Sequence, residues 1–330
     1  MTKTYRMTLS LEPLLQALDK PEKVVNKMSV VGRVLRIERS SNKDGFGLRT
    51  VVFFKGCPLR CEWCSTPESQ SLRYEIGIMR SRCTLCGKCA EVCPENIIQC
   101  CPDKGISVDN ALCIGCNKCK NICPHDALRV YGRDMSSDEV IAEISKDDIF
   151  FHHGGGLTLS GGEVLFQPLF AKDILKKSFE LGIDNTIETC AYGKWEEISP
   201  MLDYLPTIFI DLKLMDPAKH KFYTGVDNAV ILENIRKIDS SNKTKITIRV
   251  PFIPSVNDDT ENYEQMAEFS SKLNNLSAVE ILPYHRLGIE TYRNLGREIP
   301  FPDIMPPTKK DILKKIKPLN DLKDVSVRVG

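Results

Sequence analysis

Gly56-Cys57-Pro58-Leu59-Arg60-Cys61-Glu62-Trp63-Cys64, residues 56–64, is the stretch that decides the fold. Gly56 and Pro58 indicate a loop that leaves a strand. At spacings of four and three residues, the three cysteines can face one small volume, and thiolates are the soft ligands that iron–sulfur clusters take. A cubane cluster has one iron more than this run has cysteines. The run therefore predicts an iron that is open to an exogenous ligand, which indicates chemistry rather than electron storage.

Two other interpretations stay open when this run is taken alone. It contains three of the four ligands that a structural zinc site needs, and it is also compatible with a turn that is merely rich in cysteine. The rest of the chain has to decide between them.

Composition limits the class of protein. The chain of 330 residues is long enough for one large α/β domain and a small extra module. A hydrophobic content of 42% and a formal net charge of +1 are ordinary for a globular protein and indicate no nucleic-acid partner. We find no apolar run of roughly 18 residues, so we expect no membrane partner. Residues 9–18 contain Glu12 and lack a clear cleavage site, so we expect no signal peptide.

Cysteine usage indicates metal rather than disulfides. Of the fourteen cysteines, eleven fall into tight groups with ligand-like spacings. Clustered cysteines of this kind are typical of metal binding in a reducing compartment, so we expect a cytoplasmic protein.

An internal repeat lies between residues 81 and 130. Two copies of C-x2-C-x2-C-x3-C-P follow each other at an offset of 30 residues: Cys83, Cys86, Cys89, Cys93 and Pro94, then Cys113, Cys116, Cys119, Cys123 and Pro124. This is the two-cluster ferredoxin pattern, in which the fourth cysteine of each run ligates the other cluster. We therefore assign one 4Fe–4S cluster to Cys83, Cys86, Cys89 and Cys123, and a second to Cys113, Cys116, Cys119 and Cys93. A zinc ribbon would need separated cysteine pairs.

Strand-like and helical segments alternate in the rest of the chain. Ser136 with Glu139 predicts a capping box at the start of a helix, and residues 44–47 (DGFG) predict a turn. Strands are expected over residues 51–54, 157–160, 185–188, 207–211, 245–250 and 278–282, with a further one over 325–329 and an early one over 30–37. Six β/α units are fewer than the eight of a full barrel, so we predict a partial (β/α)6 TIM-type barrel with an inserted ferredoxin-like domain. The predicted parts are an extension over 1–28, the first part of the core over 29–80, the insert over 81–132, and the remaining core with the C-terminal segment over 133–330.

Polar groups follow five successive predicted strands, where parallel strands would bring them to one rim. They are Gly161, Gly162 and Glu163; Glu188, Thr189 and Cys190; Asp211 and Lys213; Arg249; and His285. Each group alone is also compatible with a turn, a surface salt bridge or a packed histidine. Their recurrence after a three-cysteine loop favours a binding site.

These motifs together resemble the glycyl-radical enzyme activating enzymes, a branch of the radical S-adenosylmethionine (SAM) superfamily, over about residues 29–296. The segments that carry the resemblance are residues 44–50 (DGFGLRT), 56–64, 159–163 (LSGGE), 211–213 (DLK), 223–225 (YTG), 249–254 (RVPFIP) and 282–288 (LPYHRLG). Phe46 and Val164 stand where the family commonly has proline, and Cys190 replaces a small residue such as serine. These departures affect loop shape more than ligands.

The resemblance implies a role for each matching residue. Cys57, Cys61 and Cys64 would hold the radical-generating cluster, with Trp63 beside it and the adenine. Gly161, Gly162 and Glu163 would face the methionine amino group of SAM. Asp211, Lys213, Arg249 and His285 would line the SAM pocket. Glu188 and Thr189 would hold the methionine end of SAM through a bound monovalent cation.

The activity that the resemblance implies is reductive cleavage of SAM to a 5′-deoxyadenosyl radical. That radical would remove a Cα hydrogen from one glycine of a large partner glycyl-radical enzyme. Three 4Fe–4S clusters, SAM and a flavodoxin or ferredoxin-type donor are the implied cofactors and partners, for a chain that we expect to be monomeric. The alternatives are another radical SAM enzyme, such as an activator of anaerobic ribonucleotide reductase or a peptide-modifying enzyme, and a non-catalytic iron–sulfur electron carrier.

Overall fold

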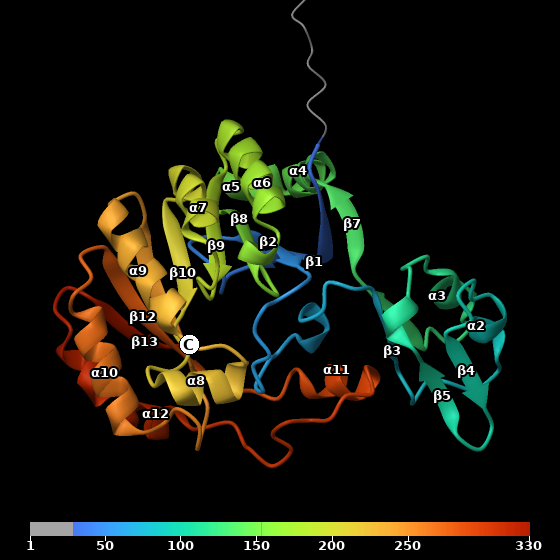
Figure 1. The fold of residues 1–330 in the computed structure, drawn as a ribbon. Coiled ribbons are helices and arrows are strands. Elements are labelled where there is room, and N and C mark those ends of the chain that lie inside the picture. Colours follow the sequence, from blue (N-terminus) through green and yellow to red (C-terminus); the bar gives the residue numbers. More distant parts are fainter. Residues whose placement is uncertain (1–28, 153) are drawn as a thin grey trace, which may run out of the picture.

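The computed structural model describes residues 29–152 and 154–330, and its largest element is a nine-stranded sheet (Figure 1). The strand order is β13-β12-β11-β10-β9-β8-β2-β1-β7. The bounds are β1 Val31–Ser41, β2 Arg49–Phe54, β7 Arg133–Ser136, β8 Gly156–Gly161, β9 Asp184–Thr189, β10 Thr207–Asp211, β11 Lys245–Phe252, β12 Leu276–Pro283 and β13 Ser326–Val329. We call this sheet and the helices packed on it the body.

The sheet is mostly parallel, as the sequence predicts. Strands β2, β8, β9, β10, β11, β12 and β13 pair in parallel, whereas β1 pairs antiparallel with both β2 and β7. All six expected strands of the β/α units are present, and residues 325–329 contain the further strand β13. Each parallel pair is joined by a crossover connection, because a short hairpin cannot return the chain in the same direction.

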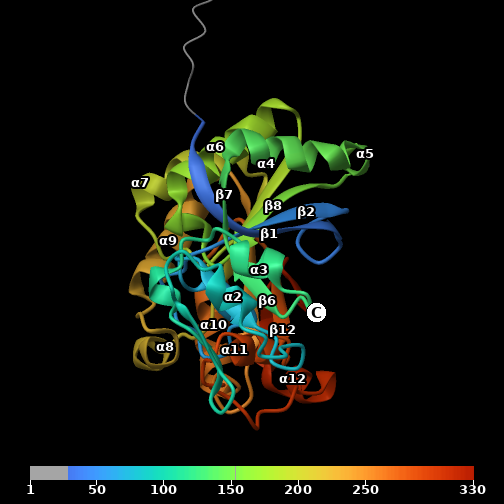
Figure 2. The same cartoon turned by 90° about the vertical axis from the view of Figure 1, so that its right-hand side faces the viewer.

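The two faces of this sheet differ in chemistry because side chains alternate along each strand. One face carries Leu157, Ile187, Ile210, Ile248 and Val279, which are buried in the main core. Helices cover that face and contribute to the same core, chiefly α6, α9 and α10 (Figures 1 and 2). The helix bounds are α4 Ser137–Ile144, α5 Asp148–Phe151, α6 Pro168–Glu180, α7 Trp195–Ile198, α8 Pro217–Thr224, α9 Ala229–Ser241, α10 Thr260–Ser270, α11 Ile289–Asn294 and α12 Lys309–Lys315.

Local sequence signals place several helix ends. The Ser136 hydroxyl accepts a hydrogen bond from the Glu139 amide, and the Glu139 carboxylate accepts one from the Ser136 amide. This is the predicted capping box, so α4 begins where the sequence places it. Helix α6 ends next to Gly182, whose φ of +74° is the left-handed conformation that glycine favours.

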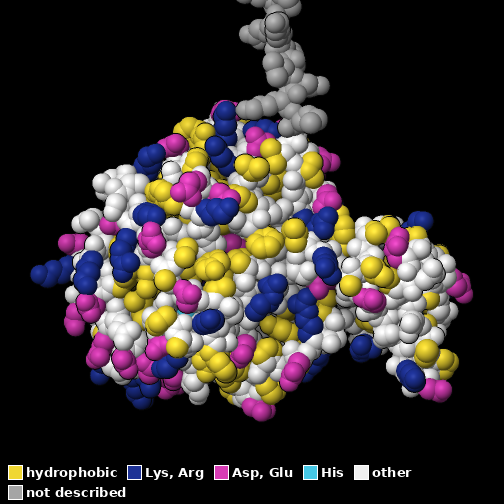
Figure 3. All heavy atoms as spheres, viewed as in Figure 1, with side chains coloured by type: hydrophobic (Ala, Val, Ile, Leu, Met, Phe, Trp, Pro, Cys, Tyr) yellow, Lys and Arg dark blue, Asp and Glu magenta, His cyan; other side chains and the backbone are white. Residues whose placement is uncertain are grey.

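A smaller lobe projects from the body and holds the eight repeated cysteines (Figures 1 and 3). Its elements are β3 Glu75–Ile78, α2 Lys88–Glu91, β4 Ile98–Cys101, β5 Gly105–Val108, α3 Lys118–Ile122 and β6 Leu128–Tyr131. Strand β3 pairs with β6 and β4 pairs with β5, both antiparallel. The second half, β5-α3-β6, follows the first, β3-α2-β4, at the same 30-residue offset as the cysteines.

The lobe begins earlier than the sequence boundary at residue 81. Strand β3 lies before Cys83, the first cysteine of the repeat, yet Ile76 and Ile78 are buried in the core of the lobe. The repeat unit is therefore a strand, a cysteine run, a short helix and a second strand. The predicted N-terminal extension over 1–28 lies outside the described residues. Within the described part of the chain, no helix combines the length and the apolar character needed to cross a bilayer.

Candidate functional site

Three other segments hold the cysteine loop of residues 56–64 in place after β2. The Gly56 amide donates to the Ser69 carbonyl at 2.7 Å, and the Arg60 amide donates to the Thr224 carbonyl at 2.7 Å. At its far end, a Cβ added to Gly288 would lie 2.7 Å from the Cys64 carbonyl oxygen, so only glycine fits there without displacement. The Tyr223–Gly225 and Leu282–Gly288 segments singled out in the sequence thus support this loop.

The three cysteines of the loop lie close to one another and to charged groups. Burial raises the pKa of Cys61 to about 12, while the neighbouring Lys213 ammonium acts in the opposite direction. Burial also raises the pKa of Cys57, and the nearby Glu163 carboxylate and Cys61 add to that shift. Burial likewise raises the pKa of Cys64. The ligand form of these side chains is the thiolate, so binding of a cationic metal centre has to release their protons.

The two glycines before Glu163 bring β8 against the start of the cysteine loop. A Cβ on Gly161, whose φ is +115°, would lie 2.2 Å from the Phe54 amide nitrogen. A Cβ on Gly162 would lie 2.3 Å from the Gly56 carbonyl oxygen. The sequence interpretation gave these glycines to a ligand, whereas here the groups that approach them are protein backbone.

Glu163 is a buried carboxylate held by three donors. The Thr189 hydroxyl donates to Oε1 at 2.5 Å, the Leu165 amide donates to the same oxygen at 2.9 Å, and the Cys190 amide donates to Oε2 at 2.7 Å. Burial raises the pKa of Glu163, while these hydrogen bonds oppose the shift. The carboxylate is therefore fixed in position next to Cys57.

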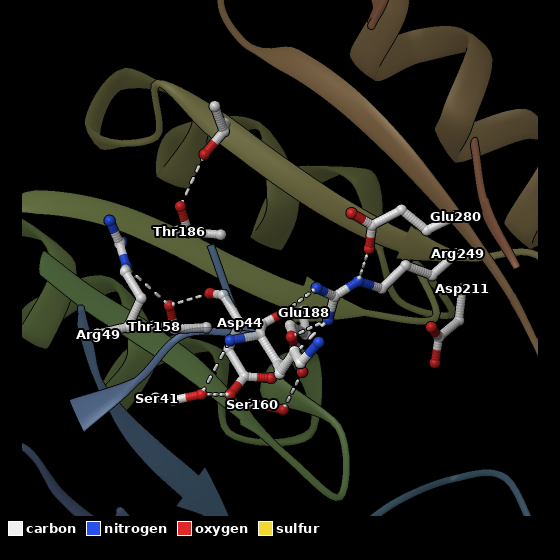
Figure 4. A network of polar contacts seen from close by, with 12 residues as sticks. Ser41, Asp44, Arg49, Thr158, Ser160, Thr186, Glu188, Asp211, Arg249 and Glu280 are labelled. Carbon is white, nitrogen blue, oxygen red and sulfur yellow. Dashed lines mark hydrogen bonds and ion pairs between the residues drawn. The ribbon is translucent and has the colours of Figure 1, made fainter. Parts of the chain in front are cut away.

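The face of the sheet opposite Leu157, Ile210 and Ile248, which we call the inner face, carries a network of charged groups in register (Figure 4). Arg249 lies beside Asp211 on one neighbouring strand and beside Glu280 on the other. Its Nε donates to Glu280 at 2.8 Å, and its Nη1 forms an ion pair with Glu188. Its guanidinium carbon also lies 3.9 Å from the centre of the Phe209 ring. Arg249 is thus enclosed by two carboxylates and an aromatic face.

Charges in this network shift one another. Burial raises the pKa of Glu188 to about 7, and the Arg249 guanidinium opposes that rise. Burial lowers the pKa of Lys213, but the Asp211 carboxylate 2.8 Å from its Nζ and the neighbouring Cys61 and Cys190 together outweigh burial and raise it. Lys213 is therefore a buried cation beside Cys61.

The structure separates some residues that the sequence grouped together. Glu188 contacts Ser160 and Arg249 on the inner face, whereas its neighbour Thr189 contacts Glu163. Trp63 packs in an aromatic cluster, with its ring centre 6.3 Å from that of Tyr223. His285 is exposed in the loop after β12.

Two acidic residues of the network were not among the predicted site residues. Asp44 lies in the predicted turn, and its carboxylate is 4.0 Å from Arg249. Glu280 has no motif, and only its register opposite Arg249 identifies it. The Asp44-Gly45 turn was a usable signal for the first, because it belongs to a segment that carries the family resemblance.

The eight cysteines of the lobe line two cavities. The first cavity, with about 340 Å³ of empty space, is lined by Cys83, Cys86, Cys89 and Cys123, together with Cys100. The second, with about 300 Å³, is lined by Cys93, Cys113, Cys116 and Cys119. In each cavity, three cysteines come from one run and the fourth comes from the other run.

No three Cys, His, Asp or Glu side chains of the described residues converge where one metal ion would bind them. A cubane cluster gives each cysteine its own iron, so its ligands surround the cluster instead of meeting at one ion. The cysteine-lined cavities fit that larger group.

A buried ion pair connects the lobe to the cysteine loop. Lys55, which directly precedes Gly56, is fully buried, and its Nζ lies 2.8 Å from the Glu75 carboxylate of β3. The same Nζ donates to the Glu68 carbonyl at 2.5 Å, and Arg297 forms a second ion pair with Glu75. Three segments that are distant in sequence meet at this junction.

Comparison with known proteins identifies this arrangement. The profile of the Radical SAM superfamily matches residues 51–267. The chain therefore belongs to the radical SAM superfamily, and it is an enzyme of the radical SAM oxidoreductase class with a 4Fe–4S cluster and SAM as the family's cofactors.

The similar curated proteins are activating enzymes of glycyl-radical enzymes. An isethionate sulfite-lyase activating enzyme from Oleidesulfovibrio alaskensis is 41% identical over 83% of this chain and 90% of its own length. A (2S)-3-sulfopropanediol dehydratase activating enzyme from Klebsiella oxytoca is 41% identical over 80% of this chain and 86% of its own. Among solved structures, Streptococcus suis SuiB bound to precursor peptide SuiA aligns with a TM-score of 0.50 at 13% identity. It covers 86% of this chain and 49% of SuiB, and it supports the fold alone.

Proposed function

We propose that this chain activates a glycyl-radical enzyme by cleaving SAM and abstracting a Cα hydrogen from one glycine of that partner. The observation that carries the proposal is the similarity to activating enzymes at 34–41% identity. The cysteine loop next to a fixed carboxylate supports it. A glycine of another protein is the substrate, which explains why the site needs no nucleophile and no acid–base pair.

Cys57, Cys61 and Cys64 would hold a 4Fe–4S cluster, which supplies the electron that cleaves the C5′–S bond of SAM to methionine and a 5′-deoxyadenosyl radical. The chain's own residues orient the substrate and exclude water. Glu163 offers a fixed carboxylate for the amino group of SAM. Lys213 offers a buried cation beside Cys61.

The remaining contacts to SAM stay predictions. We propose that six residues line the SAM pocket: Trp63, Gly161, Gly162, Asp211, Arg249 and His285. Glu188 and Thr189 are proposed to hold the methionine end of SAM through a bound monovalent cation. The described structure favours Arg249 as an organiser of the inner face, because its guanidinium is already engaged by Glu188 and Glu280.

For the lobe, we propose a ferredoxin-like insert with two further 4Fe–4S clusters in the two cavities, and for the body a partial barrel. The grouping of cysteines in each cavity supports this ligand assignment. The inserted clusters would pass electrons from a flavodoxin or ferredoxin-type donor towards Cys57, Cys61 and Cys64. Clustered cysteines of this kind suit the reducing cytoplasm, and we propose that the chain acts there as a monomer.

The test is anaerobic reconstitution with iron, sulfide, SAM and dithionite, followed by measurement of 5′-deoxyadenosine. We expect its formation in the unmodified chain and its loss in Cys57→Ala. Cys101→Ala is the matched control, because Cys101 is exposed and lines neither cavity. An electron carrier would form no 5′-deoxyadenosine at all.

The partner is tested separately, by electron paramagnetic resonance after mixing with the product of a neighbouring reading frame. A glycyl-radical doublet supports activation. Cleavage of SAM without that doublet in any co-encoded glycyl-radical enzyme would favour a peptide-modifying or other radical SAM enzyme.

A further inference from the structure

The two cavities of the lobe are built from equivalent positions of one repeat. Apart from the cysteines, Ile106 in the first cavity corresponds to Ile76 in the second, and Ala127 corresponds to Ile97. Each pair is separated by the 30-residue offset. The repeat therefore provides an internal standard: a difference between equivalent lining residues is a difference between otherwise matched sites.

Most of the differences have one direction. The exception is Asn117, which lines the second cavity where Gly87 lines the first, but its side-chain amide donates to the Gly115 carbonyl at 3.0 Å. Cys100 lines the first cavity where Val130 lines the second, and Thr84 corresponds to Ile114. Glu95 lines the second cavity at the position where the first has His125. The first cavity is also lined by Arg82, which forms an exposed ion pair with Asp126 at 3.4 Å; its equivalent, Leu112, does not line the second cavity.

Residues of these kinds affect the reduction potential of an iron–sulfur cluster that they surround. The potential of an iron–sulfur cluster depends on net charge and on hydrogen bonds to its sulfurs. Reduction adds one negative charge, so a guanidinium or a donor such as a thiol stabilises the reduced form. A carboxylate or an apolar wall does not. The first cavity has Arg82 and Cys100, and the second has Glu95 and Val130.

We propose that the lobe is electronically unequal: the cluster of the first cavity has the higher reduction potential, set chiefly by Cys100 and more weakly by Arg82, because Asp126 pairs with Arg82. This inference rests on the proposed function, in which both cavities hold 4Fe–4S clusters. One electron from a low-potential reductant therefore occupies the first cavity before the second. The reductant loses that electron, and no proton or covalent bond changes.

The test is a potentiometric titration with dithionite, followed by electron paramagnetic resonance. The full chain carries Cys57→Ser, Cys61→Ser and Cys64→Ser, so that only the clusters of the lobe contribute signals. Cys100→Val should lower the higher of the two potentials, and the mirror change Val130→Cys should raise the lower one. We expect each to shift the electron's distribution by up to tenfold, which is about 59 mV for a one-electron couple.

Arg82→Leu, which copies Leu112 at the equivalent position, is the second variant and should also lower the higher potential. Unchanged potentials in both Cys100→Val and Arg82→Leu would overturn the inference, and so would a shift of the lower potential by Cys100→Val. Loss of iron in Cys100→Val would instead make Cys100 a ligand and overturn its tuning role. A lobe that never binds about eight irons defeats the proposed clusters themselves, whereas equal potentials at full iron content defeat only this inference.

Discussion

The body and the lobe are stabilised in different ways. The body buries aliphatic and aromatic side chains between seven parallel strands and three main helices. The core of the lobe has eight buried residues, of which two, Cys89 and Cys119, belong to the cysteine runs. Small domains with little apolar core need cross-links or metals for stability. The lobe should therefore depend on its clusters for folding, and the body should not.

Removal of iron should have the largest effect, and it should affect the lobe but not the body. After anaerobic treatment with a chelator, we expect amide hydrogen exchange protection to be lost across residues 75–131, because metal binding and folding of such a site are coupled. Strands β8 to β12 should keep their protection. Reconstitution with iron and sulfide should restore the lobe. Equal loss in both regions, or protection of β3 to β6 without iron, would contradict the contrast.

The second-largest effect is expected when the buried ion pair between the body and the lobe is broken. Lys55→Met leaves the Glu75 carboxylate buried with Arg297 alone, and breaking a buried pair typically costs 3–5 kcal/mol, so we expect a loss of about 3 kcal/mol. Denaturant unfolding measures this loss, and hydrogen exchange should locate it at β3 and residues 56–64.

Two comparisons test that the loss comes from an unpaired charge. Lys55→Met combined with Glu75→Leu should recover part of the stability, because no buried carboxylate is left without its partner. Lys176→Met is the matched control, since Lys176 lies half-exposed on α6 in a pair with Glu180, and we expect a change below about 0.5 kcal/mol. A double variant that is less stable than Lys55→Met would argue against this explanation.

The sequence predicts what depends on local pattern. Cysteine spacing, the parallel strands and the Ser136 capping box are all local signals, and the structure has the strands and the cap as expected. The start of the lobe at Glu75 could not be predicted in this way, since β3 has no cysteine and its partner β6 lies about fifty residues away. Glu280 was missed for the same reason, because its role depends on strand register.

Core truncation compares the two regions residue by residue. Leu159→Ala removes a fully buried core side chain of β8, the strand between β2 and β9, and should cost about 2–5 kcal/mol of body stability. Ile106→Ala in the lobe should increase hydrogen exchange within residues 75–131 and leave the unfolding midpoint of the body unchanged. Coupled loss of both regions in Ile106→Ala would show that they unfold as one unit.

The smallest expected effect is the change in stability of the body with pH. Its sign follows from the raised pKa of Glu188. Burial raises the pKa of Glu188 to about 7 from a model-peptide value of 4.5, while Arg249 opposes the shift. Between about pH 4.5 and 7, the folded chain then holds a proton that the unfolded chain has released. This contribution to stability is fully present below pH 4.5 and is lost as the pH rises through 7, at up to about 1.4 kcal/mol per pH unit.

Unfolding by denaturant at pH 5.5 and pH 7.5 measures this contribution, and Glu188→Gln should remove it, so that the difference between the two pH values changes. Asp138→Asn is the matched control: Lys177 lowers the pKa of Asp138 below 3.8, so its titration lies outside this window. Other groups titrate in both chains, and only the change on substitution reports on Glu188. An identical pH difference in Glu188→Gln and the unmodified chain would mean that the ion pair with Arg249 keeps Glu188 ionised throughout. Amide hydrogen exchange in the lobe should be the same in Glu188→Gln and in the unmodified chain in either case, because Glu188 lies on the inner face of the body.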